Sequence, residues 1–273
     1  MLTIDTHYHA SESWFEPIEV LLFHMGRAGV DKAVLAQHRE EWDNRYIIEC
    51  ARRFPGRFAA IGAIDVTQPD AVETLERWAA EGMEGVRFWA TERSPGADPL
   101  AIWRKTADLA LLVSCPGTTG EYASDDFQSL VEELPDLPIV LEHLAILETL
   151  THGVKGVPQP PYTDFKKALS LSRFPNIYLK ITGLGEIMPR PSPARTPPFD
   201  LDKVPPFIDM AIDAFGADRL MIGTDPTSSV REGYLNVWRY LREYLARRSV
   251  AEQEAIFGKT ADRVFRFSAE PKR

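Results

Sequence analysis

Short apolar runs alternate with longer amphipathic stretches along almost the whole chain. Eight of the runs are apolar on both faces, which is typical of parallel strands covered by helices on both sides. These runs span Leu2–Thr6, Lys32–Ala36, Phe58–Ile64, Gly85–Phe88, Ala110–Ser114, Ile139–Glu142, Ile177–Ile181 and Leu220–Gly223. The pattern therefore predicts eight buried strands.

The stretches between the runs are predicted to be helices, and several end at glycine or shortly before proline, as helices commonly do. They span Pro17–Gly29, Asp43–Phe54, Asp70–Glu81, Asp98–Leu109, Phe127–Leu134, Thr163–Ser172, Pro205–Phe215, Glu232–Arg247 and Ala251–Phe267. Eight strand–helix units in about 250 residues match a (β/α)8 TIM barrel, so we predict one such domain over residues 1–273. A doubly wound open sheet is the alternative, but no Gly-x-Gly-x-x-Gly follows the first strand.

Two stretches are rich in proline, Val154–Pro161 and Met188–Pro206. Neither can form a helix interior or a central strand. The second follows the seventh predicted strand, which in a barrel places it on the catalytic face. It is expected to form a wall or lid there, with a solvated linker as the alternative.

Composition narrows the classes of function. The chain has 273 residues, of which 44% are hydrophobic, and a formal net charge of −9, which argues against a nucleic-acid surface. Cys50 and Cys115 are too few for a disulfide framework and indicate a reducing, cytoplasmic setting. No apolar run reaches the ~18 residues of a membrane span, and no secretion signal opens the chain. The oligomeric state is left open, with a homo-oligomer among the alternatives.

The strand ends carry the residues that matter for chemistry, because TIM barrels gather their sites there. The first strand runs into His7 and His9, which share one face and can bind one divalent ion. The eighth strand ends at Asp225, an oxygen ligand and a candidate proton acceptor. Taken singly, the histidine pair can be a surface feature, and Asp225 can start a turn before Pro226.

Five further polar residues follow other strands: His38, Arg87, Cys115, His143 and Lys180. Each has a plain structural alternative. His143 can be a hydrogen-bonded core histidine, Arg87 a salt-bridge partner and Cys115 a small buried hydrophobe, while Lys180 can extend from the barrel interior. Their convergence on one barrel mouth favours a functional site.

The stretches around these residues resemble a known family along essentially the whole chain. They are Ile4-Asp5-Thr6-His7-Tyr8-His9, Gly85-Val86-Arg87-Phe88, Ile139-Val140-Leu141-Glu142-His143-Leu144, Asn176–Gly183, Leu220–Pro226 and Phe257-Gly258-Lys259-Thr260-Ala261. The family is the amidohydrolase superfamily, in particular its amidohydrolase-related branch, which contains lactonases and decarboxylases.

The resemblance implies a role for each site residue. His7 and His9 are implied to ligate a metal or, in metal-free relatives, to contact substrate, and Asp225 to activate water. His143 is implied to polarise the substrate. We expect one divalent ion on His7, His9 and Asp225, with Zn²⁺ favoured by imidazole-rich ligation.

Two departures from the family pattern bear on that ion. The metal-dependent decarboxylases carry a histidine where this chain has Cys115, so either Cys115 is a thiolate ligand or the ion is weakly bound or absent. Binuclear members need a carboxylated lysine on the fourth strand, whereas Lys180 of this chain lies on the seventh predicted strand. A binuclear centre is therefore not expected.

The leading hypothesis is a hydrolase of a small carboxylated lactone, ester or amide, in which Asp225 activates water. Arg87 is expected to hold the substrate carboxylate bidentately. Lys180, Cys115 and His38 are further candidates for substrate contact. A metal-dependent decarboxylase of an aromatic or muconate-type acid is the alternative, and a barrel that has lost catalysis is the third hypothesis.

Overall fold

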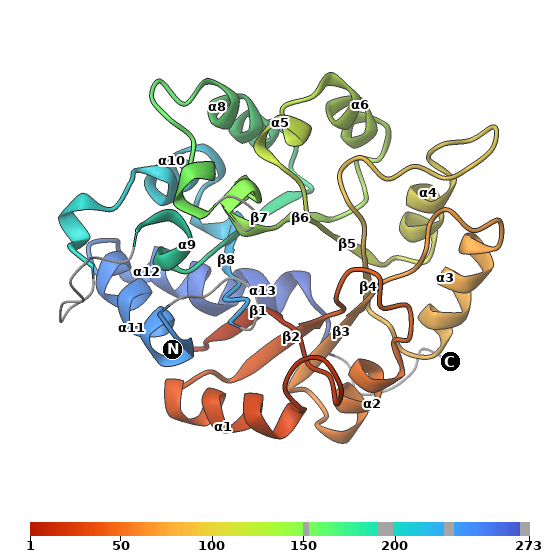
Figure 1. Cartoon of the computed structure of the whole chain (residues 1–273), viewed down its shortest axis with the longest axis horizontal. Helices are drawn as coiled ribbons and strands as arrows, with labels where there is room; N and C mark the ends of the chain where they lie inside the picture. The colour runs from red at the N-terminus through yellow and green to blue at the C-terminus, as the bar shows by residue number, and fades with distance from the viewer. Residues whose placement is uncertain (150–152, 190–198, 227–231, 268–273) are drawn as a thin grey trace.

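The computed structural model describes residues 1–149, 153–189, 199–226 and 232–267. Within these residues, eight parallel strands follow one another in sequence order and a ring of helices surrounds them (Figure 1). The strands are β1 (Ile4–Tyr8), β2 (Lys32–Ala36), β3 (Phe58–Gly62), β4 (Gly85–Arg87), β5 (Leu112–Cys115), β6 (Ile139–Leu141), β7 (Ile177–Ile181) and β8 (Leu220–Ile222). This arrangement confirms the predicted TIM barrel.

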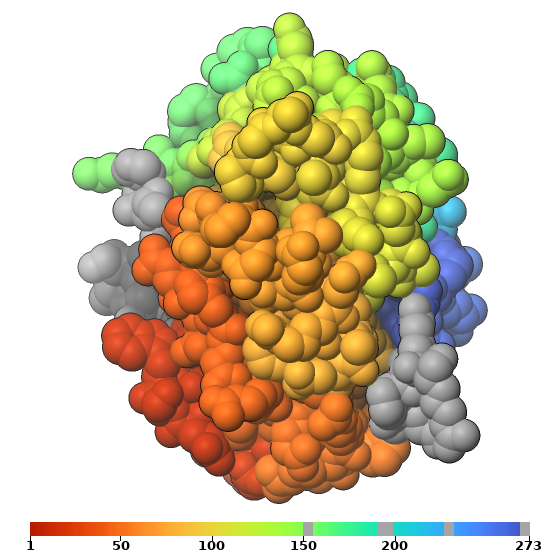
Figure 2. Space-filling view, turned by 90° about the vertical axis from the view of Figure 1, so that its right-hand side faces the viewer, coloured from red at the N-terminus to blue at the C-terminus, as the bar shows by residue number. Residues whose placement is uncertain are grey.

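Helices and short helical turns connect the strands. The helices are α1 (Ile18–Ala28), α2 (Arg45–Arg53), α3 (Ala71–Ala80), α4 (Ala101–Asp108), α5 (Thr119–Tyr122), α6 (Asp125–Glu133), α8 (Thr163–Leu169), α9 (Leu184–Ile187), α10 (Phe207–Phe215), α11 (Tyr234–Leu245), α12 (Val250–Glu254) and α13 (Thr260–Val264). The turns are η1 (His143–Ala145), η2 (Gly153–Gly156), η3 (Ser170–Arg173), η4 (Leu201–Lys203), η5 (Ala217–Arg219) and η6 (Ala255–Lys259). Figure 2 shows one side of this outer layer, where the orange-to-yellow part of the chain covers the barrel.

The first strand begins two residues later than predicted and contains a bulge. Three steps from Asp5 to Tyr8 oppose only two steps along β2. The extra residue changes which side chains face inward. Ile4 packs in the barrel interior, whereas Tyr8 packs in the outer layer against the helices. His7 and His9, on either side of Tyr8, therefore point into the barrel.

Hydrogen bonds join β8 to β1 and bring the two ends of the predicted site together. The backbone N–H of Asp225 donates to the carbonyl oxygen of His7 over 2.9 Å. The buried carboxylate of Asp5 accepts the N–H of His7 at 3.1 Å and the N–H and hydroxyl of Thr224 at 3.0 and 2.5 Å. Asp5 thus fixes the position of His7 relative to Asp225.

An inner hydrophobic cluster fills the barrel at the end opposite the site. Its buried members are Ile4, Val34, Ala59, Ile61, Leu112, Val140, Met221, Ala261, Phe265 and Phe267. The last three come from the C-terminal segment, so this segment closes the barrel at the N-terminal ends of the strands. A much larger cluster lies between the strands and the helices.

Some predicted elements differ in extent. The predicted helix Ala251–Phe267 begins one residue earlier, at Val250, contains the π-helical turn η6 between α12 and α13, and ends at Val264. Of the proline-rich stretch Met188–Pro206, residues 190–198 lie outside the described part of the chain, so the wall or lid stays a prediction. None of the helices in the described ranges is long and apolar enough to cross a membrane.

Candidate active site

His7, His9 and Asp225 meet at the C-terminal ends of β1 and β8. The two Nε2 atoms of His7 and His9 lie 3.3 Å apart, and His9 Nε2 lies 3.5 Å from Asp225 Oδ1. One ligand atom of each of the three residues lies within 4.8 Å of the other two, and all three side chains are buried. The structure thus brings together the three residues that the sequence predicted as metal ligands.

The chemistry of these donors fits one divalent ion. Two imidazole nitrogens bound tetrahedrally at zinc distances are about 3.3 Å apart, because each lies ~2.0–2.1 Å from the ion. His9 Nδ1 donates to the carbonyl oxygen of Ala36 over 2.7 Å, so the proton of this ring is on Nδ1 and Nε2 is the nitrogen that can accept a hydrogen bond or ligate an ion. Burial lowers the pKa of His9 to about 4 and that of His7 well below its usual value. Both rings are therefore neutral at pH 7, as metal ligation requires.

His143 faces the second carboxylate oxygen of Asp225, the one that does not face His9. Its Nε2 lies 3.8 Å from Asp225 Oδ2, and its Nδ1 lies 3.2 Å from Glu186 Oε2 on α9. The hydroxyl of Thr182 donates to the other carboxylate oxygen of Glu186. Burial works against a charged ring, but the carboxylates of Glu186, Asp225 and Glu142 together outweigh it and raise the pKa of His143. His143 is thereby prepared to donate a proton or hydrogen bond from Nε2.

Both His143 and Asp225 hold left-handed backbone conformations that non-glycine residues rarely adopt. Their φ angles are 50° and 40°, and Leu144 and Ala145 continue the left-handed turn after His143. Such conformations cost about 1–3 kcal/mol each and cluster at functional sites. Here the Thr119 hydroxyl supports the turn by donating to the Ala145 carbonyl over 2.8 Å.

A buried charge network lies beside His7. Glu142 is fully buried and accepts two N–H groups of Arg87, at 3.2 and 2.7 Å. The Ser114 hydroxyl and the Lys180 ammonium approach the other oxygen at 2.6 and 3.4 Å. Burial alone would raise the pKa of Glu142, but the positive charges of Arg87 and Lys180 hold it well below its usual range. Burial lowers the pKa of Lys180, and Glu142 opposes this shift.

A second group of three, His7, Glu142 and His143, has the spacing of metal ligands. Its carboxylate is already matched by Arg87 and Lys180, which would repel a second cation. The His7–His9–Asp225 group is therefore the better cation site of the two.

The network corrects the expected role of Arg87. We expected its guanidinium fork to hold a substrate carboxylate, but Glu142 occupies the fork and the Gln37 carbonyl accepts a further N–H at 3.2 Å. The sequence pattern missed this because Glu142 lies 55 residues away, directly after another strand, β6. Arg87 therefore has a structural role, because its hydrogen bonds connect the Glu142 carboxylate to the Gln37 carbonyl.

The structure also corrects the expected role of Cys115. Ser114 points into the barrel and contacts Glu142 and Lys180, so the next residue on β5 points outward. Cys115 belongs to the cluster between strands and helices, and burial raises the pKa of its thiol well above the usual value. It is placed neither to ligate the ion nor to contact substrate.

The remaining predicted residues lie around the centre. Lys180 is buried, with Nζ 3.2 Å from His7 Nδ1. The half-buried His38 ring lies 5.5 Å from the His9 ring and 5.1 Å from Phe15, as part of the wall. Next to it, the exposed guanidinium of Arg39 lies 4.5 Å from the centre of the Trp89 ring.

Arg39 was not predicted as a site residue. It lines a small cleft with Arg87, Trp89 and Glu92. Within the described residues Arg39 forms no salt bridge, whereas Arg87 is paired with Glu142. A sequence signal existed, since Arg39 directly follows the predicted His38, but nothing distinguished it from an ordinary surface arginine.

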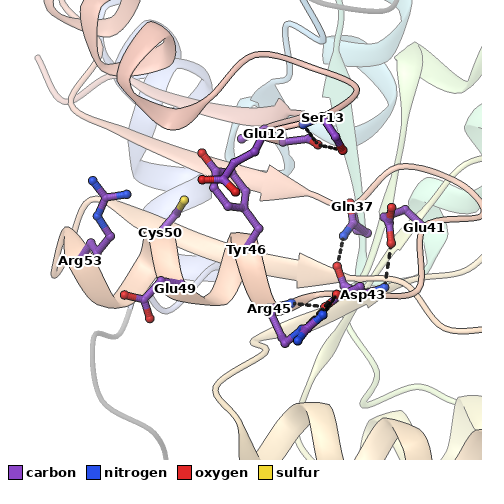
Figure 3. Close-up of a pocket in the computed structure, with 12 residues that line it drawn as sticks. Glu12, Ser13, Gln37, Glu41, Asp43, Arg45, Tyr46, Glu49, Cys50 and Arg53 are labelled. Atoms are coloured by element: carbon purple, nitrogen blue, oxygen red, sulfur yellow. Dashed lines mark hydrogen bonds and ion pairs between the residues drawn. The ribbon is translucent and has the colours of Figure 1, made fainter.

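A separate cleft of about 490 Å³ lies between residues 10–13 and α2 (Figure 3). Carboxylates and two arginines line it, and Arg45 is paired with Asp43 while Arg53 is paired with Glu19. None of the predicted site residues borders this cleft. We assign it no ligand.

Known proteins resemble this chain in sequence. A 4-sulfomuconolactone hydrolase from Hydrogenophaga intermedia is 32% identical over 206 residues, which cover 72% of this chain and 59% of that enzyme. An L-fucono-1,5-lactonase from Burkholderia multivorans is 26% identical over 261 residues, covering 89% of this chain and 83% of that enzyme. The match to the first relative thus spans less than two thirds of its length.

Solved structures share the fold. An amidohydrolase from Burkholderia multivorans with bound zinc superposes with a TM-score of 0.74 at 22% identity, covering 97% of this chain and 99% of that one. A Pseudomonas putida protein provisionally assigned as a 2-pyrone-4,6-dicarboxylic acid hydrolase gives 0.72 at 21% identity, covering 99% and 100%. The family model for amidohydrolases matches residues 5–267. Because that match covers nearly the whole chain and includes every residue of the buried centre, this protein belongs to the amidohydrolase family.

Proposed function

We propose that the protein hydrolyses a small lactone that carries a negatively charged group. The observation that supports this most is one buried carboxylate, Asp225, facing His9 at 3.5 Å and His143 at 3.8 Å. A carboxylate can accept a proton from water while neighbouring imidazoles polarise a carbonyl group. The names of two relatives, 4-sulfomuconolactone hydrolase and L-fucono-1,5-lactonase, support the lactone class.

In this proposal the two halves of the centre have opposite tasks. Asp225 accepts the proton of the attacking water, an action worth ~10²–10⁴-fold in rate. His143, which Glu186 orients through Nδ1, donates from Nε2 to the carbonyl oxygen and then to the leaving oxygen of the opened ring. Both residues hold left-handed backbone conformations, and their side chains face one another, with His143 Nε2 3.8 Å from Asp225 Oδ2.

One Zn²⁺ is the proposed cofactor, held by His7, His9 and Asp225. The imidazole-rich donor set favours zinc, and a related barrel from Burkholderia multivorans was solved with zinc bound. A bound divalent ion lowers the pKa of water and polarises a carbonyl group. Without the ion, the Nε2–H group of His143 supplies weaker polarisation.

Arg39 is the proposed contact for the negative group of the substrate, in place of Arg87. Arg39→Ala should raise KM several-fold for a carboxylated or sulfonated lactone and leave KM for a neutral lactone nearly unchanged, because only the charged substrate loses an ion pair. Steady-state kinetics on both substrates measures this. Lys105→Ala on α4, which removes the same charge at a distance, is the control. An equal rise for both substrates would show that Arg39 acts on the shape of the mouth and not on charge.

The proposed activity is tested with a panel of three lactones taken from the relatives: 4-sulfomuconolactone, L-fucono-1,5-lactone and 2-pyrone-4,6-dicarboxylate. Purified protein is assayed after chelation and after addition of Zn²⁺ or Mn²⁺. Ring opening of 4-sulfomuconolactone or 2-pyrone-4,6-dicarboxylate, with release of one proton per turnover, is the expected result, and L-fucono-1,5-lactone is the uncharged comparison. Release of carbon dioxide from an aromatic or muconate-type acid instead would identify a decarboxylase.

A further inference from the structure

Lys180 occupies an unusual place beside a candidate metal ligand. Its ammonium nitrogen lies 3.2 Å from His7 Nδ1, on the side of the ring opposite the candidate ion position. Ser114 and Glu142 hold the same ammonium at 2.6 and 3.4 Å, and the lysine side chain is only 1% exposed. The ammonium is therefore fixed against this ring.

A metal-bound histidine needs the opposite kind of partner. One ring nitrogen binds the ion, and the other carries a proton that it donates to a carboxylate, a carbonyl group or water. His9 satisfies this rule, because Nδ1 donates to the Ala36 carbonyl at 2.7 Å and Nε2 faces the site. His7 does not, because its Nδ1 faces an ammonium group, which can only donate.

The nearest acceptor for a proton on His7 Nδ1 is Glu142 Oε1, at 3.6 Å. That oxygen already faces the Ser114 hydroxyl, Lys180 and an Arg87 N–H at 2.6, 3.4 and 3.2 Å. Its lone pairs are thus engaged by three other donors. A proton on His7 Nδ1 has no well-placed acceptor among the described residues while Lys180 keeps its position.

Without an ion, an unbroken series of hydrogen bonds runs from Lys180 through His7 and His9 to the Ala36 carbonyl. Lys180 donates to His7 Nδ1, which places the His7 proton on Nε2. His7 Nε2–H then donates to His9 Nε2 over 3.3 Å, and His9 Nδ1–H donates to the Ala36 carbonyl. In this series of hydrogen bonds, the lone pair of each histidine already accepts a hydrogen bond, so neither is free to bind an ion. An incoming cation must break two of these bonds and meets the charge of Lys180.

We propose that Lys180 weakens divalent-ion binding at His7, His9 and Asp225, so that the ion is exchangeable and the protein is stable without it. This inference rests on the proposed zinc site but not on the proposed reaction. Lys180 then controls the metal affinity of the site, whereas the sequence had suggested that it contacts substrate.

The test measures zinc affinity, which does not depend on turnover. Metal-free wild type, Lys180→Met and Lys180→Gln are titrated with Zn²⁺ against a chromophoric chelator of known affinity. Both variants should bind zinc ~10–100-fold more tightly, the usual scale for changing the outer partner of a metal-bound histidine. Lys180→Gln should bind at least as tightly as Lys180→Met, because its amide oxygen can accept the His7 Nδ1 proton.

Two controls define what a change means. Lys105→Met removes one positive charge on α4 and should leave the zinc affinity unchanged, which excludes a general effect of net charge. His9→Asn in each background should abolish the tight site, which places the ion. Equal or weaker zinc binding by both folded Lys180 variants would overturn the inference while the zinc site itself remained. No zinc binding by any of the proteins would overturn both, and lactone turnover would still be judged separately.

A second measurement uses the wild-type protein and does not depend on any variant folding. ¹⁵N-labelled histidine spectra of the metal-free protein should show His7 with its proton on Nε2 and an unprotonated Nδ1. Addition of Zn²⁺ should move the proton to Nδ1. A His7 proton on Nδ1 before zinc is added would contradict the proposed role of Lys180.

Discussion

Asp225→Asn is expected to lower kcat for lactone hydrolysis by ~10²-fold or more, the usual scale for the loss of a general base. Asparagine keeps the size of the side chain and an oxygen that can still approach an ion, but it cannot accept the proton of the attacking water. The backbone should tolerate the change, because asparagine is one of the residues that adopt the φ of 40° found here. Substrate KM and thermal stability should therefore change little.

Steady-state kinetics and thermal unfolding of the same preparation check this prediction. Zinc content is measured in parallel, so that a loss of turnover is not confused with a loss of metal. Unchanged turnover in a folded, metal-matched variant would remove Asp225 from the mechanism and leave it as a turn residue before Pro226.

Glu142→Leu is expected to destabilise the protein by about 3–5 kcal/mol, the scale for breaking a buried ion pair by removing one partner. Glu142 is the carboxylate between two buried cations, with Arg87 at 2.7 Å and Lys180 at 3.4 Å. Leucine fills the space but leaves both charges without a partner in the barrel interior. Urea unfolding, extrapolated linearly to zero denaturant, gives the free energy of unfolding.

Two further variants make this prediction specific. Glu243→Leu breaks an exposed pair with Arg239 on α11 and should change stability little, since surface pairs contribute little. The double variant Arg87→Met/Glu142→Leu should be less destabilised than the sum of the two single changes, because it removes both partners together. Additive costs would show that Arg87 and Glu142 act independently, contrary to the geometry.

The barrel was predictable from sequence because its signal is local and repeated. Buried parallel strands are apolar on both faces, so Lys32–Ala36 and Ile177–Ile181 were predicted at the bounds that the structure shows. The bulge in β1 was not predictable, because a bulge inserts a residue without a change in composition. His7 and His9 nevertheless point the same way, since their Nε2 atoms lie 3.3 Å apart.

The parts of the site that sequence reasoning missed depend on contacts between distant residues. Glu142 had no role until the fold placed it between Arg87 and Lys180, and Glu186 had none until α9 carried it to His143. Ser114 and Cys115 are neighbours on β5, and which of the two points inward depends on the register of that strand. The predicted strand ends thus showed which segments meet at the site, but not which of their side chains are paired with one another.

The most direct test of the central claim is the fate of the oxygen atom of water. The wild-type protein, loaded with zinc, is given a lactone that it opens, in water enriched in ¹⁸O. Hydrolysis through Asp225 predicts one ¹⁸O atom in the new carboxylate of the product and release of no carbon dioxide, with both product and label reduced ~10²-fold for Asp225→Asn. An unlabelled product, or one that has lost a carboxyl group, would contradict water activation at this site.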